Sequence, residues 1–276
     1  MALFTVFGNP IAHSLSPAIH QAFAAQAGIT LRYTRSLTST AQFRRAVATF
    51  FHQGGAGANV TAPFKQQAFA LVNQLTPRAQ LAGAVNTLVP LGQGQLLGDN
   101  TDGVGLVHAL QHHCQQLLTQ RVIVICGAGG ATRGVLGPLL AQQVDHIVIA
   151  NRTLSRAQEL VAAVRDARVQ AVTYEQLRIP VGALVIQATS TDHLPLTDEQ
   201  LASAAAWYDM RYGAQPTFMM QRAQQAGVPQ VYDGLSMLVE QAAVAFQLWH
   251  PDIELDTEPV LTQLRAQLMH QGAEIG

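Results

Sequence analysis

Short apolar runs alternate with longer amphipathic segments through the first hundred residues of the chain. The predicted strands are Leu3–Phe7, Leu31–Arg35, Gly57–Val60, Val85–Val89 and a segment near Leu96. Helices are predicted between them at Ser16–Gly28, Ala41–His52 and Phe64–Val72. Ser16 precedes Pro17 and is therefore expected to cap the first of these helices. This alternation predicts a small α/β domain over residues 1–101.

A more regular pattern follows a connecting helix predicted at residues 102–118. Its strands are expected at Val122–Cys126, Ile147–Ala150, Val169–Val172, Ala183–Ala188, Trp207–Met210 and Val231–Tyr232. Helices are expected from Ala131 and from Ser155. Strands separated by helical segments favour a parallel, doubly wound sheet, which places a Rossmann-like domain at residues 102–235. The last predicted helices are Leu235–Trp249 and Glu258–His270, and we expect residues 236–276 to pack back on the first domain. The expected fold is thus α/β, with two domains separated by a cleft.

Composition narrows the class of protein. The chain has 276 residues, 49% of them hydrophobic, with a formal net charge of −1 and no basic tract, so nucleic-acid binding is not expected. The first ten residues lack the basic start and apolar run of a signal peptide, and no apolar stretch reaches about 18 residues. Cys114 and Cys126 are too few for a disulfide framework and are expected to be reduced. We therefore expect a soluble, cytoplasmic enzyme.

The cations are unevenly divided between the two basic residue types. Lysine and arginine total 16, yet Lys65 is the only lysine. An arginine keeps its proton in proteins, whereas a lysine can be tuned to release one. Lys65 is therefore a candidate proton donor and acceptor, although genomic base bias alone explains a shortage of lysine equally well.

A glycine-rich loop follows the predicted strand Val122–Cys126. The strand is nearly all apolar, as expected when both faces of a sheet are covered, and a predicted helix comes directly after the loop. Glycines allow the backbone to approach a pyrophosphate at a helix N-terminus. Thr132 stands where a strict GxGxxG pattern has its last glycine. The expected cofactor-binding residues are Gly127, Ala128, Gly129, Gly130 and Ala131.

The end of the next strand distinguishes NAD from NADP. NAD sites usually have a carboxylate there, which binds the ribose 2′-hydroxyl. This chain instead has Asn151, Arg152, Thr153 and Arg156. Two guanidinium groups can bind a 2′-phosphate through charge-assisted hydrogen bonds, so the expected cofactor is NADP.

Polar residues form four blocks in the first domain. They are Ser14–Ser16, Asn59–Lys65, Gly83–Thr87 and Asp99–Gly103. In this order, and followed by the glycine loop and Asn151–Thr153, the blocks resemble the shikimate dehydrogenase family over nearly the whole chain, from Gly8 to Gln241. The resemblance implies reversible, NADPH-dependent reduction of 3-dehydroshikimate to shikimate, in the pathway to aromatic amino acids.

The resemblance also implies roles for individual residues. Lys65 and Asp102 would be the catalytic pair, consistent with the need for a positioned base when an alcohol becomes a carbonyl. Ser14, Ser16 and Tyr212 would bind the substrate carboxylate. The remaining substrate contacts, or residues that position the pair, would be Asn59, Thr61, Asn86, Asp102 and Gln241. Thr189 would approach the cofactor, and Met210 and Gly234 would flank the nicotinamide.

Several of these residues have alternative roles, and one position departs from the family. Asp102 could cap a helix that begins at Gly103, and Asn59 and Asn86 could simply satisfy buried backbone groups. Gln187 replaces the family's usual asparagine, which puts its contact in doubt. No metal is expected, because consecutive helical residues such as His112, His113 and Cys114 cannot converge on one ion.

Three other functions remain possible from the sequence. A dual-specificity quinate/shikimate dehydrogenase differs only in substrate breadth. A methylene-tetrahydrofolate dehydrogenase also uses a lysine, but the serine pair and the Asp99–Gly103 block disfavour it. A non-catalytic NADP-sensing relative would be expected to have lost Lys65 or Asp102. The expected partner is a small-molecule substrate, and the enzyme is expected to be a monomer or a homodimer.

Overall fold

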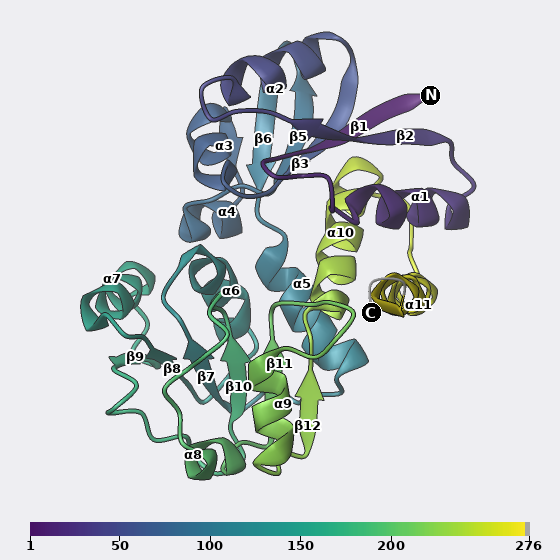
Figure 1. Ribbon diagram of the computed structural model, residues 1–276. Helices are drawn as coiled ribbons and strands as arrows, with labels where there is room; N and C mark the ends of the chain where they lie inside the picture. Colours follow the sequence, from purple (N-terminus) through teal and green to yellow (C-terminus); the bar gives the residue numbers. More distant parts are fainter. Residues whose placement is uncertain (274–276) are drawn as a thin grey trace. The chain divides into compact units, whose positions relative to one another are not determined.

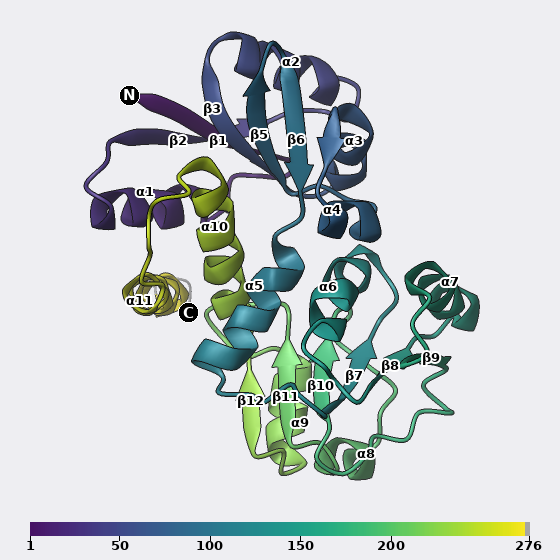
Figure 2. The ribbon, with the colours of Figure 1, turned by 180° about the vertical axis from the view of Figure 1, so that it is seen from behind.

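The computed structural model describes residues 1–273 and divides into two compact units (Figures 1 and 2). Unit 1 contains Met1–Gly105 and Val239–Val260, and unit 2 contains Leu106–Leu238 and the chain from Leu261 onward. The division thus falls after Gly105 rather than after residue 101. The last helix also differs from expectation, because its residues from Leu261 group with unit 2. There the Arg265 guanidinium donates to Asp233 Oδ1 at 2.7 Å.

Unit 1 is built on a six-stranded mixed sheet. Its strands are β1 (Ala2–Gly8), β2 (Leu31–Leu37), β3 (Gly55–Val60), β4 (Gln74–Leu75), β5 (Thr87–Gly92) and β6 (Gln95–Asp99). They lie in the order β2-β1-β3-β5-β6-β4. β1 is parallel to β2 and β3, whereas β5 is antiparallel to both β3 and β6. The antiparallel pairs bring the residues before β5 and after β6 to the same end of β3.

Helices cover both faces of this sheet (Figure 1). The helices whose residues lie mostly in unit 1 are α1 (Ser16–Gln26), α2 (Phe43–His52), α3 (Lys65–Leu71), α4 (Pro77–Ala82), α5 (Asp102–His108) and α10 (Leu235–Trp249). Residues of α2, α3 and α4 pack with Val60 and Leu88 on one face. On the other face, Phe4 and Tyr33 form a cluster against Trp249 of α10.

Unit 2 contains the parallel sheet that the sequence predicted. Its strands are β7 (Val122–Cys126), β8 (His146–Ala150), β9 (Val169–Val172), β10 (Leu184–Gln187), β11 (Ala206–Asp209) and β12 (Gln230–Tyr232). They lie in the order β12-β11-β10-β7-β8-β9, and every neighbouring pair is parallel. This is the doubly wound order in which the winding reverses between β7 and β10, where such folds bind ligands at the carboxyl ends of the strands.

Two apolar layers enclose the parallel sheet. The other helices of the chain are α6 (Gly130–Leu140), α7 (Leu154–Val164), α8 (Asp198–Ala202), α9 (Phe218–Gln225) and α11 (Glu258–Ala273). α6 and α7 pack on the face that contains Ile123 and Ile125, while α8 and α9 pack on the face that contains Val124 and Trp207. The predicted doubly wound α/β fold is therefore confirmed. Within residues 1–273, none of the helices combines the length and the apolar character needed to cross a bilayer.

The connecting helix predicted at residues 102–118 is shorter than expected. α5 ends at His108, and a π-helical turn over Ala109–His113 follows it. The chain then turns at Gln115, which has a positive φ of 51°. A helix cannot continue through a residue in that left-handed conformation, so the segment before β7 is not helical.

Candidate functional site

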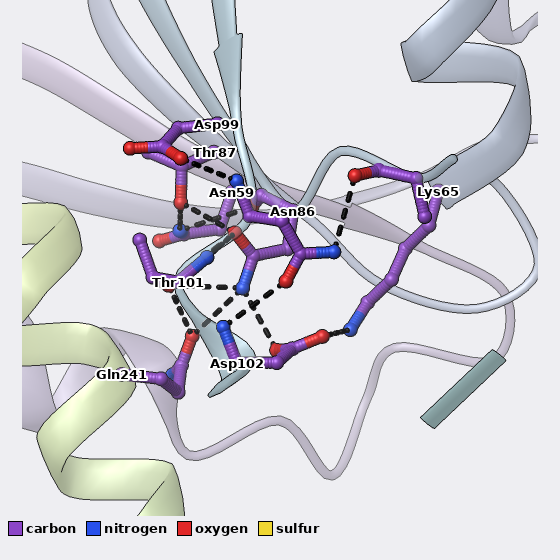
Figure 3. A network of polar contacts seen from close by, with 10 residues as sticks. Asn59, Lys65, Asn86, Thr87, Asp99, Thr101, Asp102 and Gln241 are labelled. Atoms are coloured by element: carbon purple, nitrogen blue, oxygen red, sulfur yellow. Dashed lines mark hydrogen bonds and ion pairs between the residues drawn. The ribbon is translucent and has the colours of Figure 1, made fainter. Parts of the chain in front are cut away.

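Lys65 and Asp102 lie together in unit 1 (Figure 3). Lys65 is the first residue of α3, just beyond the end of β3, and Asp102 is the first residue of α5, just beyond β6. Lys65 Nζ donates to Asp102 Oδ2 at 2.6 Å. Their side chains are 33% and 17% exposed, so the pair is partly shielded but still accessible to a small molecule. Two charges in this setting interact more strongly than a pair in bulk water.

Asn86 holds the second oxygen of Asp102. Its Nδ2 donates to Asp102 Oδ1 at 2.8 Å, while its Oδ1 accepts from the backbone N–H of Thr101 at 2.9 Å. A backbone N–H can only donate, so this contact fixes which way the carboxamide faces. Asp102 therefore accepts from Asn86 on one oxygen and from Lys65 on the other.

Gln241 of α10 reaches the same group of side chains. Its Oε1 accepts from Asn86 Nδ2 and from Thr101 Oγ1, both at 3.3 Å. α10 can approach this closely because residue 105 of α5 is a glycine. A Cβ on Gly105 would lie 2.6 Å from the backbone nitrogen of Gln241, which is closer than real atoms pack.

The serine pair lies at the start of α1. Ser14 Oγ donates to Ser16 Oγ at 3.2 Å, and Ser14 Oγ also accepts from the backbone N–H of Ser16 at 3.3 Å. The prediction that Ser16 caps α1 is wrong: Leu15 occupies the cap position, without a side-chain hydrogen bond. Ser16 is already the first helical residue, and its hydroxyl oxygen accepts from Ser14 Oγ. Arg35 Nε and Nη2 donate to the Ser14 carbonyl at 3.0 and 2.6 Å and hold this loop.

The two remaining substrate candidates of this unit are on β3 and just after it. Asn59 is 6% exposed, and its amide bonds to the Asn86 carbonyl and to Thr87 Oγ1, as the alternative reading of a buried amide anticipated. Thr61 follows β3, and its backbone N–H donates to the Phe7 carbonyl at 2.9 Å. The other alternative, in which Asp102 caps a helix from Gly103, is wrong, because α5 begins at Asp102 itself.

An ion pair that the sequence analysis did not identify supports the loop before Asp102. The buried Asp99 carboxylate accepts from Arg78 Nε at 2.7 Å, from Thr76 Oγ1 at 2.6 Å and from the Asn100 N–H at 2.7 Å. Burial alone would raise the pKa of Asp99, but these hydrogen bonds outweigh it and lower the pKa below its usual value. The Asp99–Gly103 block therefore contains two acids with different roles. Asp99 stabilises the loop, and Asp102 contacts Lys65.

The glycine loop of unit 2 has the open backbone that a pyrophosphate requires. Gly127 directly follows β7 with a φ of +115°, which a side chain would strain. A Cβ on Gly129 or Gly130 would have no atom within 4 Å, so the space in front of both residues is open. α6 begins at Gly130, and Gly129 provides no side-chain cap. Its first N–H groups can therefore bind an anion.

Thr132 explains the departure from the strict glycine pattern. Its side chain is buried, and its Oγ1 donates to the Gly127 carbonyl at 2.8 Å. The hydroxyl thus satisfies a carbonyl within the loop. The third glycine of the pattern is not needed here.

The residues after β8 are arranged around the start of α7. Asn151 Nδ2 donates to the Thr153 carbonyl at 2.8 Å, and Thr153 is the cap residue of α7. Arg152 and Arg156 are exposed on either side of it. Across residues 1–273, neither guanidinium forms an ion pair with a carboxylate, so both remain available to a phosphate.

One further cofactor candidate, Thr189, follows β10. The Thr189 hydroxyl is buried and has no hydrogen-bond partner within the described part of the chain. Its methyl group lies only 2.5 Å from where a Cβ on Gly127 would be, so Thr189 borders the glycine loop. Gln187 is the last residue of β10. Its Nε2 donates to the Thr191 carbonyl at 3.0 Å and so stabilises the loop that follows the strand.

The last candidates lie after β11 and β12. A Cβ on Gly234 would fall 2.1 Å from the Met210 carbonyl oxygen, so these two residues are in direct contact. Tyr212 is 37% exposed in the loop after β11, and burial of its ring raises the pKa of its hydroxyl. The open glycines, the unpartnered Thr189 hydroxyl and the two exposed arginines together fit NADP. Among residues 1–273, no cluster of three metal-ligating side chains occurs, and the segment with His112, His113 and Cys114 forms none.

Three family models match the chain in sequence order. Residues 6–88 match the shikimate dehydrogenase substrate binding domain, residues 109–215 match shikimate / quinate 5-dehydrogenase, and residues 234–265 match the shikimate 5′-dehydrogenase C-terminal domain. Curated relatives agree with these models. A shikimate dehydrogenase (NADP(+)) of Cellvibrio japonicus is 49% identical, with 96% of this chain and 98% of the relative covered. One of Aeromonas hydrophila is 47% identical, with 97% and 99% covered.

Solved structures show the same architecture. The shikimate 5-dehydrogenase of Thermus thermophilus, in complex with NADP(H) and shikimate, is 31% identical with a TM-score of 0.84, and 96% of this chain and 99% of that one are covered. An Ael1 enzyme of Pseudomonas putida is 37% identical with a TM-score of 0.89, with 96% and 98% covered. Together with the family models, these similarities establish that the chain belongs to the shikimate dehydrogenase family.

Proposed function

We propose that this chain catalyses the reversible, NADPH-dependent reduction of 3-dehydroshikimate to shikimate, a step toward the aromatic amino acids. One observation supports this most strongly. The chain's only lysine lies 2.6 Å from Asp102 at an accessible site, as the resemblance implies for the catalytic pair. The relatives named above provide the substrate and the cofactor of the proposal.

In this reaction Lys65 donates or accepts the proton, and Asp102 holds Lys65 in position. Bound NADPH supplies the hydride that reduces the ketone. The developing negative charge on the carbonyl oxygen is neutralised by a proton from Lys65 Nζ, and the alcohol is formed. In the reverse direction the lysine amine accepts the hydroxyl proton. The Asp102 carboxylate accepts a hydrogen bond from Lys65 Nζ at 2.6 Å and so fixes the direction in which Nζ points.

The polar groups near the pair provide donors for a hydroxylated acid. The hydroxyls of Ser14 and Ser16 are 3.2 Å apart, a spacing that lets both donate to one carboxylate. Thr61, Asn86 and Gln241 are proposed to bind or orient the ring hydroxyls.

The cofactor is proposed to bind along the carboxyl ends of the unit 2 strands. The pyrophosphate would lie on Gly127–Ala131 at the start of α6. The 2′-phosphate would contact Asn151, Arg152, Thr153 and Arg156. Thr189 would donate its unpartnered hydroxyl, and Met210 and Gly234 would border the nicotinamide.

The proposal is tested by following NADPH absorbance when the purified chain is given shikimate and NADP+. A rise that requires both compounds is expected, and no rise at any pH would contradict the proposal. Quinate in place of shikimate tests substrate breadth, because one of the matching family models is described as shikimate / quinate 5-dehydrogenase. NAD+ in place of NADP+ tests the cofactor preference.

We further infer that the enzyme works in the cytoplasm as a monomer or a homodimer. Both cysteines are buried free thiols, as suits a reducing compartment. Burial raises the pKa of each to about 12, so neither is a reactive thiolate at neutral pH. Cell fractionation and light scattering on the purified protein test the two statements.

A further inference from the structure

A buried polar cluster in unit 1 surrounds Asn59, and two of its residues have no assigned role. His20 of α1 and Tyr33 of β2 are 1% and 4% exposed. Their rings stack with centroids 4.4 Å apart and planes inclined by 5°. Both point their polar atoms at Asn59: the Tyr33 hydroxyl donates to Asn59 Oδ1 at 2.6 Å, and His20 Nε2 lies 3.1 Å from the same oxygen.

The direction of these hydrogen bonds follows from their partners. Asn59 Nδ2 donates to the Asn86 backbone carbonyl at 3.2 Å, and a carbonyl can only accept. Asn59 Oδ1 therefore faces His20 and Tyr33, and His20 must carry its proton on Nε2. Burial lowers the pKa of His20 to about 3, so the ring is neutral at physiological pH. The neutral His20 ring, protonated on Nε2, therefore donates to Asn59 Oδ1, and its stacking on Tyr33 holds it in this orientation.

The donors continue in one direction from Asn59 to the pair (Figure 3). Asn59 Nδ2 also donates to Thr87 Oγ1 at 3.1 Å, and Thr87 Oγ1 donates to Asn86 Oδ1 at 2.9 Å. Asn86 Nδ2 then donates to Asp102 Oδ1 at 2.8 Å. Asn59, Asn86 and Thr87 are all buried, so each amide and hydroxyl needs its partner, and bonds in such a chain polarise one another.

We propose that His20 and Tyr33 are positioning residues for the reaction, acting through Asn59 and Asn86 on the carboxylate of Asp102. This inference rests on the proposed function. Its physical basis is that Asn59 Oδ1 has two donors, and the loss of either weakens the orientation of the amide that supports Asn86. Asn59 is then also a positioning residue rather than a substrate contact, because the four partners of its amide are all within the protein.

The experiment compares four variants by steady-state kinetics with shikimate and NADP+. His20→Phe keeps a ring on Tyr33 but removes the donor, whereas His20→Gln retains a side-chain N–H that can reach Asn59. Tyr33→Phe removes the other donor. Phe246→Leu is the matched control, because this buried ring lies 6.1 Å from the His20 ring but donates no hydrogen bond to Asn59.

We expect kcat to fall about tenfold in His20→Phe and in Tyr33→Phe, since small displacements of catalytic groups have effects of this size or more. In His20→Phe the KM for shikimate should stay within about twofold, and His20→Gln should recover most of kcat. Unchanged kcat in His20→Phe, a loss confined to KM, or an equal loss of kcat in Phe246→Leu would overturn the inference. Tyr33→Phe provides the same test if His20→Phe does not fold. A wild-type enzyme inactive on shikimate would instead overturn the proposed function, and this inference with it.

Discussion

Lys65 Nζ lies 2.6 Å from Asp102 Oδ2, although the two residues are 37 positions apart in the chain. Each is the first residue of a helix, and the strand preceding each helix belongs to the same sheet. Helix starts of this kind hold a side chain at a defined position, because the backbone is anchored on one side by the strand and on the other by the helix. The pair is therefore fixed by the architecture of unit 1.

Replacing Lys65 by arginine separates charge from proton transfer. Lys65→Arg retains a cation for Asp102 but cannot release its proton. We expect kcat to fall about 10²- to 10⁴-fold, as for loss of a general acid–base group. The measurement is steady-state NADPH formation, with the thermal midpoint as a check on folding. Arg44→Lys on the exposed part of α2 is the control, and comparable loss in both variants would contradict the assignment.

Removal of Arg152 is expected to change cofactor preference. Arg152→Met deletes a cation that forms no ion pair within residues 1–273, so the folded state should lose little stability. A charge-assisted hydrogen bond contributes about 1.5–3 kcal/mol, so the KM for NADP+ should rise about tenfold or more, while the KM for NAD+ should stay constant. Arg44→Met should leave both constants unchanged. Equal losses with NADP+ and NAD+ would argue against a 2′-phosphate contact.

Gly105 should not tolerate a side chain. Gly105→Ala would place a methyl group 2.6 Å from the backbone nitrogen of Gln241, so α5 and α10 must move apart. The free energy of unfolding should fall by about 1–3 kcal/mol, and the KM for shikimate should rise as Gln241 is displaced. Urea denaturation and kinetics measure the two effects. Val104→Ala, one position earlier, adds no atoms and should leave KM unchanged.

The stability of unit 1 should depend on pH through His20. Burial lowers its pKa from 6.5 to about 3, so between these values the unfolded chain binds a proton that the folded chain does not. Stability then decreases as the pH falls, by up to about 1.4 kcal/mol per pH unit. His20→Phe lacks this titration and should show a shallower slope in urea denaturation between about pH 7 and pH 4.5. Parallel slopes for the two proteins would contradict the burial argument.

The sequence predicts the strands of unit 2 better than the short elements of either unit. The expected bounds of Val122–Cys126 and Val169–Val172 agree with β7 and β9. β7 is a central strand packed between two layers and is therefore nearly all apolar, whereas the edge strand β9 is only partly buried. α4, α8, α9 and the two-residue β4 were not predicted, since elements this short have little periodicity. The capping box of Thr197 and Gln200 at the start of α8 was the available signal.

The residue types of the candidate site and their order along the chain could be predicted from the sequence. The residues that hydrogen-bond to the site residues and hold them in place could not. The Lys65–Asp102 pair and the open glycine loop follow from motifs that each lie within a few residues. Arg78 and Tyr33 bind residues 21 and 26 positions away, and nothing in a local pattern indicates such partners. Ser16 shows the opposite error. A good local signal for a helix cap was overridden when the helix began one residue earlier.

A solitary amine at one-third exposure has a practical consequence. Besides the terminal amine, Lys65 Nζ is the one primary amine of this chain that an acylating reagent can modify. Peptide mapping by mass spectrometry would then distinguish acylation at Lys65 from acylation of the terminal amine. Slower labelling in the presence of a ligand would report ligand occupancy directly, on the unmodified gene product and without turnover.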